Sequence, residues 1–209
     1  KVCLSLKDYT NAAAYADKVI TKSNFALSTT SVEYAQAFVS NSSSKELVFA
    51  LANKRSTSLL FFYQTVHDID PTWDYSPSTE CSSHLSDATA LKSKDIRAKA
   101  VFGSDNSRII KFPNGSTGQF VTNEQPSQIP IVVTRVAEMY LIKAEALGAV
   151  NGLSTLKEFM NKRYATVLLP SNMTDIEFQN QILDERHREL YAEGQRWYDL
   201  KRTNRLDLF

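Results

Sequence analysis

The chain has 209 residues, of which 43% are hydrophobic, 11% aromatic and 22% charged, a composition that excludes a chain disordered throughout. We therefore expect a globular protein with a single domain spanning residues 1–209. The 24 Lys and Arg residues nearly balance 23 Asp and Glu residues, giving a formal charge of +1 and no overall field that favours nucleic acid or an anionic membrane. The longest apolar runs, residues 47–52 and 59–63, fall far short of the roughly 20 residues that span a bilayer.

The N-terminal part is predicted to be helical near residues 8–21. Apolar residues there recur at steps of three and four, and Asp8 is the expected N-cap. Residues 2–6 resemble the end of another helix. Residues 46–52 form an apolar run that could be either a strand or a buried segment, and the sequence alone does not decide between them.

The cysteines and the first residues indicate little about location. Cys3 and Cys81 lack the spacing of a zinc site or a disulfide framework, so we expect two unpaired thiols. No charged and apolar leader follows Lys1, and a signal peptide is therefore expected to be absent or already removed.

The middle of the chain is predicted to be an irregular, loop-rich insertion near residues 66–130. Periodicity fades there, while Ser, Asp, Asn, Pro and Gly accumulate. We expect loops with a few short strands, one of them at residues 108–112 and followed by a turn at Asn114-Gly115.

Helical periodicity returns in two C-terminal regions, near residues 135–165 and 175–203. The first is predicted to be a hairpin in which Gly152 ends one helix, and Leu147-Gly148 resembles a step of tetratricopeptide repeats. Small residues that would let its helices approach closely are Ala137, Ala144 and Ala146.

The helix of the second region has a clear predicted start. Residues 174–177 match a capping box, and Met173 and Phe178 are placed as a hydrophobic staple. Gly194 is expected to interrupt this helix before a short continuation. The expected buried stripe consists of Phe178, Ile182, Leu183, Leu190 and Trp197.

Residues 184–202 carry many carboxylates, which invites a comparison with glycosidases. A general acid at neutral pH needs a carboxyl whose pKa is raised, whereas a neighbouring guanidinium lowers it. Arginines stand beside most of these carboxylates, so an ion-paired structural network is the favoured interpretation, and no catalytic residue is predicted. The pairs expected from three-residue spacing are Glu185 with Arg188, Arg186 with Glu189, and Glu193 with Arg196.

No cofactor or metal site is predicted. The histidines His67, His84 and His187 stand alone, and the sequence has no glycine-rich phosphate loop. Loop carboxylates could in principle bind calcium, but they lack the loop pattern that calcium sites show. These carboxylates are Asp68, Asp70, Asp87 and Asp95.

Aromatic residues of the irregular region are the candidate ligand-binding residues. Trp73 and Tyr75 could present flat apolar faces to sugar rings, while Asp74 could accept hydrogen bonds from hydroxyl groups. The alternative is that these side chains bind no ligand. The nearby Phe61 and Phe62 are expected to be core residues.

The C-terminal motifs resemble the SusD/RagB family of nutrient-binding lipoproteins. The resemblance is weaker at residues 12–20 and 25–27 and at Asp95-Ile96-Arg97. The motifs that carry it are residues 135–146, residues 156–163, Ile182-Leu183-x-Glu185-Arg186, Glu189-Leu190, Glu193-Gly194 and Arg196-Trp197-x-Asp199-Leu200-x-Arg202.

This resemblance implies a mainly α fold of tetratricopeptide-like helical hairpins, an α-α superhelix, with a loop-rich irregular region and a few short strands. It implies a non-enzymatic protein that binds oligosaccharide, or peptide in the RagB branch, at the cell surface of the outer membrane. The implied partner is a SusC-like TonB-dependent transporter, and the matched Arg and Glu residues are mainly scaffold.

The chain also departs from the family pattern. Typical members are longer and carry a lipid anchor, whereas Cys3 is not expected to be an anchor, so we expect a C-terminal portion of a longer protein. Two alternatives stay open beside glycan binding: a helical-repeat scaffold that binds only protein and, least favoured, a glycoside hydrolase that uses Glu185.

Overall fold

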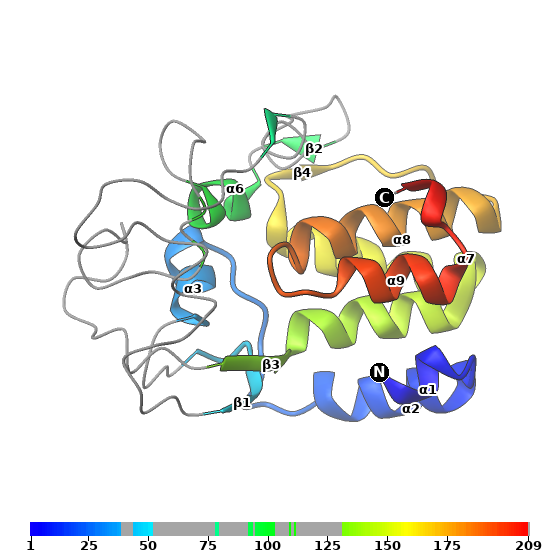
Figure 1. Ribbon diagram of the computed structural model, residues 1–209, viewed down its shortest axis with the longest axis horizontal. Coiled ribbons are helices and arrows are strands. Elements are labelled where there is room, and N and C mark those ends of the chain that lie inside the picture. Colours follow the sequence, from blue (N-terminus) through cyan, green and yellow to red (C-terminus); the bar gives the residue numbers. More distant parts are fainter. Residues whose placement is uncertain are drawn as a thin grey trace. The chain divides into compact units, whose positions relative to one another are not determined.

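The computed structural model describes residues 1–38, 44–51, 78–79, 92–93, 95–102, 109, 111 and 131–208. They belong to two compact units (Figure 1). The helical unit comprises Lys1–Leu27, Ala90–Ser93 and Val136–Phe209, and the mixed unit comprises Ser28–Thr89 and Lys94–Arg135. The single-domain organisation stays a prediction.

The helical unit has helices in each of the three regions predicted to be helical. Its helices are α1 (Val2–Ser5), α2 (Tyr9–Ile20), α7 (Val136–Arg163), α8 (Asp175–Glu189) and α9 (Arg196–Thr203), with a final 3₁₀ turn η2 (Leu206–Leu208). Strand β2 (Lys92–Ser93) pairs with β4 (Thr166–Val167) in antiparallel orientation. Asp8 caps α2 as predicted, since its carboxylate accepts a hydrogen bond from the Asn11 backbone N–H.

The first half of α7, residues 136–147, lies at the centre of the helical unit. One side, with Met139 and Ile142, packs against α1 and α2, and another side, with Leu141 and Ala144, faces the core shared with α8. Figure 1 shows α2, α7 and α8 running side by side, in agreement with their contacts. Layers of paired helices therefore bury the apolar stripes that the periodicity predicted.

The break in α7 corrects one prediction. Gly148, not Gly152, interrupts the helix. Its φ of 69° and ψ of −179° form a backbone conformation that residues other than glycine rarely adopt. Gly152 lies inside the second half, where an added Cβ would be 2.0 Å from the Ala144 carbonyl oxygen. Gly152 thus serves the close approach of the two halves, in agreement with the small residue expected at Ala144.

The start of α8 matches its prediction, whereas part of its stripe does not. Thr174 and Glu177 form the capping box, and Gly194, with a φ of 72°, lies in the turn before α9. Trp197 was predicted to be buried, but its side chain is 48% exposed. The prediction was wrong because α9 is a separate helix after this turn, so the period of α8 does not continue into it.

The mixed unit contains short elements. Helix α3 (Ser31–Gln36) packs against α6 (Ile96–Val101), and strand β1 (Leu47–Leu51) pairs antiparallel with β3 (Ile131–Arg135). Within the apolar run, Leu47–Leu51 thus forms a strand. Arg135, predicted to begin a helix, ends β3 instead.

The loop-rich prediction for residues 66–130 missed α6, because six residues are too few to show a helical period. Of the strand predicted at residues 108–112, the structure describes Ile109, in an isolated bridge with Phe102, and Lys111. Asn114-Gly115 lies outside the described residues, as does Cys81, whereas Cys3 is a free thiol. None of the described helices has the length and apolar character needed to cross a bilayer.

Candidate functional site

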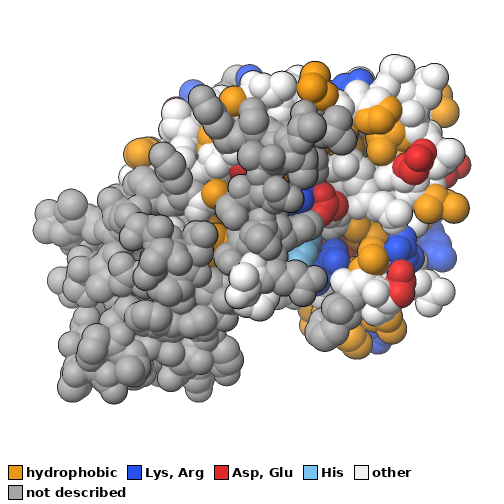
Figure 2. Space-filling model, turned by 90° about the horizontal axis from the view of Figure 1, so that it is seen from above, with side chains coloured by type: hydrophobic (Ala, Val, Ile, Leu, Met, Phe, Trp, Pro, Cys, Tyr) orange, Lys and Arg blue, Asp and Glu red, His pale blue; other side chains and the backbone are white. Residues whose placement is uncertain are grey.

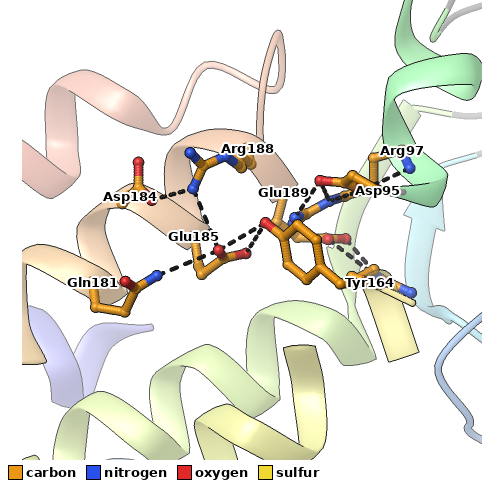
Figure 3. Close-up of polar contacts among 9 residues, drawn as sticks. Asp95, Arg97, Tyr164, Gln181, Asp184, Glu185, Arg188 and Glu189 are labelled. Carbon is orange, nitrogen blue, oxygen red and sulfur yellow. Dashed lines mark hydrogen bonds and ion pairs between the residues drawn. The ribbon is translucent and has the colours of Figure 1, made fainter. Parts of the chain in front are cut away.

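Charged side chains are buried inside the helical unit, mostly along α8. Glu185 is fully buried, and its carboxylate accepts hydrogen bonds from Tyr164 Oη at 2.8 Å and from Gln181 Nε2 at 3.4 Å (Figure 3). Arg188 Nη1 lies 3.4 Å from Glu185 Oε1 and also bonds the Asp184 carboxylate. Donors from α8 and from the residue after α7 therefore converge on one carboxylate.

A second buried pair joins the end of α7 to the end of α8. Arg163 donates from Nε to Glu189 Oε2 at 2.9 Å and from Nη2 to Glu189 Oε1 at 3.1 Å, and both side chains are fully buried. The Arg163 guanidinium also lies 5.3 Å from the ring centre of Phe159. This two-pronged geometry fixes the two helix ends relative to each other.

A third group connects α7, α8 and α9. Asp199 accepts from Arg186 Nε at 2.8 Å through one oxygen and from Arg202 Nη2 at 2.8 Å through the other. Arg202 also bonds Glu145 of α7. Arg186 Nη2 lies 3.6 Å from Glu138, whose other carboxylate oxygen pairs with Lys1 at 2.8 Å.

The electrostatics of this group hold its arginines charged. Burial opposes the charge on Arg186, but attraction by Asp199, Glu145 and Glu138 outweighs it and raises the pKa of the guanidinium. Burial likewise opposes the charge on Arg202, where Glu145 prevails and raises the pKa. Arg186 and Arg202 therefore stay charged across the physiological pH range.

The predicted network exists, but only one of the three expected pairs is present. Glu185 pairs with Arg188 as predicted. Arg186 is directed to Asp199 and Glu138 instead of Glu189, and Arg196 donates to the backbone oxygens of Leu183 and Leu208 instead of pairing with Glu193. Spacing along one helix could not reveal these partners, because they come from other elements.

The mixed unit has buried charges that the sequence analysis did not single out. Arg135 Nη1 lies 3.0 Å from Glu46 Oε2, and both side chains are 1% exposed. The Arg135 guanidinium and the Lys111 ammonium lie within 6 Å of the ring centres of both Tyr34 and Phe38. Arg135 and Glu46 are 89 residues apart, so no local pattern could pair them.

The chemistry of these buried groups favours support over catalysis. The described partners of Glu185 are Tyr164, Gln181 and Arg188, so its carboxylate joins α8 to the residue that follows α7. Within the described part of the chain, no three His, Cys, Asp or Glu side chains are placed to hold a metal ion. On the face shown in Figure 2, the described acidic and basic side chains are interspersed.

The predicted ligand-binding residues Trp73, Asp74 and Tyr75 lie outside the described residues. The same holds for the loop histidines and for the phenylalanines expected in the core. His187 is described, and its ring centre lies 6.3 Å from that of Tyr191.

Comparison with known proteins identifies the family. The model of the SusD family matches residues 62–208. The chain belongs to the SusD family. A curated relative, SusD-like protein P38 of Formosa agariphila, is 37% identical over 86 residues, which cover 36% of this chain and 17% of that protein. The predicted SusD/RagB resemblance is thereby confirmed.

Solved SusD-like structures share the fold. A SusD-like carbohydrate binding protein from Bacteroides vulgatus superposes with a TM-score of 0.72 at 22% identity, covering 96% of this chain and 43% of that one. Surface glycan-binding protein A from Bacteroides thetaiotaomicron, in complex with laminarihexaose, gives 0.65 at 14% identity, covering 98% and 52%. The mainly α, tetratricopeptide-like fold class is confirmed, and this SusD-family chain spans about half the length of these proteins.

Proposed function

We propose that this chain belongs to a non-enzymatic protein of the bacterial cell surface that binds oligosaccharide and delivers it to a SusC-like TonB-dependent transporter in the outer membrane. The family match over residues 62–208 carries this proposal. The likeness to a surface glycan-binding protein in complex with laminarihexaose supports glycan as the ligand class.

The buried charges support binding without hydrolysis. Glu185 and Glu189 are fully buried among hydrogen-bond donors in the helical core, where they hold helices together. A retaining or inverting glycosidase needs one carboxyl group that stays protonated beside its substrate. We therefore expect no release of product from oligosaccharide by the wild-type chain.

Recognition is assigned to the aromatic segment that contains Trp73 and Tyr75. A sugar ring presents C–H groups on its faces, which stack on aromatic rings, and hydroxyl groups on its rim, which carboxylates such as Asp74 bind. The alternative ligand is an oligopeptide.

Isothermal titration tests this assignment. Laminarihexaose, other oligosaccharides and a set of peptides would be titrated into the wild-type chain, Trp73→Ala and Trp197→Ala. The chain has two tryptophans, so Trp197→Ala, in α9, is the matched control. We expect at least one oligosaccharide to bind, an affinity about tenfold or more lower in Trp73→Ala, and little change in the control.

Each other outcome has a defined meaning. Wild-type affinity in Trp73→Ala would remove Trp73 from the site. Binding of peptides but no glycan would favour the oligopeptide alternative. Capture of a transporter by a chain that binds neither would favour the protein-interaction scaffold.

A further inference from the structure

Among the described residues, one donor of the buried charge network has no acceptor. Arg186 is 4% exposed, and its Nε bonds Asp199 at 2.8 Å. Nη2 lies 3.6 Å from Glu138 Oε1, which is longer than a hydrogen bond. Nη1 is buried and has no hydrogen-bond partner in the described part of the protein.

Such a donor is costly to bury. A guanidinium carries five N–H donors, and a buried charged group with an unsatisfied donor loses solvation that nothing replaces. Buried polar groups in folded proteins are almost always hydrogen-bonded to protein or to ordered water. Ordered water is therefore the expected acceptor for a buried donor that the described protein groups leave unpaired.

The charges of the group indicate what kind of molecule fits. Three cationic side chains face three carboxylates, so the formal charge of the group is zero. The members are Lys1, Arg186, Arg202, Glu138, Glu145 and Asp199. A neutral group gives no net attraction for an anion. The molecule at Nη1 must accept a hydrogen bond from the guanidinium, and water does so without adding a charge to the group.

We propose that an internal water molecule binds at Arg186 Nη1 and accepts a hydrogen bond from it. The water completes the hydrogen bonding of the guanidinium, whose Nε bonds Asp199. The site is independent of the proposed glycan ligand.

A high-resolution crystal structure of the wild-type chain, from crystals soaked in sodium bromide, tests the proposal. We expect a peak of water-like density about 2.7–3.2 Å from Nη1, without an anomalous bromide contribution. An anomalous peak would show an anion site and overturn the proposal. So would a direct bond from Nη1 to a protein oxygen, or the absence of density beside it.

Oxygen-17 relaxation dispersion, which counts long-lived internal waters, provides a test in solution. Arg186→Met removes the donors while keeping an unbranched side chain, and Arg205→Met, at an exposed pair with Asp207, is the matched control. We expect Arg186→Met to lose one long-lived water and the control to lose none. An unchanged count in a folded Arg186→Met would overturn the proposal, and if that variant does not fold, the wild-type crystal decides.

Discussion

The stability of the helical unit should depend on Asp199. This side chain is 4% exposed and accepts from Arg186 at 2.8 Å and from Arg202 at 2.8 and 3.0 Å. Asp199→Asn keeps the shape but removes the charge that two arginines share. Removing one partner of a buried ion pair costs about 3–5 kcal/mol. The asparagine oxygen still accepts one hydrogen bond, so we expect the free energy of unfolding to fall by about 3 kcal/mol.

Thermal unfolding followed by circular dichroism measures this effect. For a chain of this size, a loss of about 3 kcal/mol lowers the midpoint by roughly 6–12 °C. Asp207→Asn is the control, because Asp207 also pairs with an arginine but is 61% exposed, and its midpoint should stay near wild type. If both variants melted alike, the reasoning that the buried charges brace the helices would be refuted.

Two further predictions concern the helix contacts. Gly152→Ala should destabilise the chain by about 3 kcal/mol or more, because the new methyl group would clash with the Ala144 backbone. Denaturation in urea measures this loss of stability. An unchanged free energy of unfolding would contradict the close approach of the two halves of α7. Hydrogen bonds from Thr174 lower the pKa of Glu177 below 4.5. Ionised Glu177 therefore stabilises the folded chain above pH 4.5, and this contribution is lost as the pH falls through the lowered pKa. The difference in urea midpoint between wild type and Glu177→Gln should therefore be larger at about pH 7 than at about pH 3. A difference that does not change with pH would contradict the capping box.

Local features of the fold could be predicted from the sequence. The capping box at Thr174 and the N-cap at Asp8 depend on neighbours within four residues, and both are present. Helical periodicity located α2, α7 and α8 because each buries a stripe that repeats along its own axis. The glycine that breaks α7 could not be chosen from the sequence, since Gly148 differs from Gly152 in its positive φ and in its surroundings.

Long-range partners could not be predicted. The carboxylates that pair with Arg186 lie on α7 and α9. Glu46 pairs with Arg135, which is 89 residues away in the sequence. The helical period of α8 also wrongly predicts that Trp197 is buried, because the turn at Gly194 separates α8 from α9. The charged motif forms buried ion pairs, as the sequence predicts, but only one of the three predicted pairs, Glu185 with Arg188, is present.

We propose that buried charges hold the helices together, whereas the aromatic side chains Trp73 and Tyr75 recognise the ligand. Calorimetric titration of the best-binding oligosaccharide into Asp199→Asn and Trp73→Ala, at a temperature where both are folded, tests it most directly. The account predicts wild-type affinity for Asp199→Asn and an affinity about tenfold or more lower for Trp73→Ala. Loss of binding in folded Asp199→Asn, with wild-type affinity in Trp73→Ala, would contradict it.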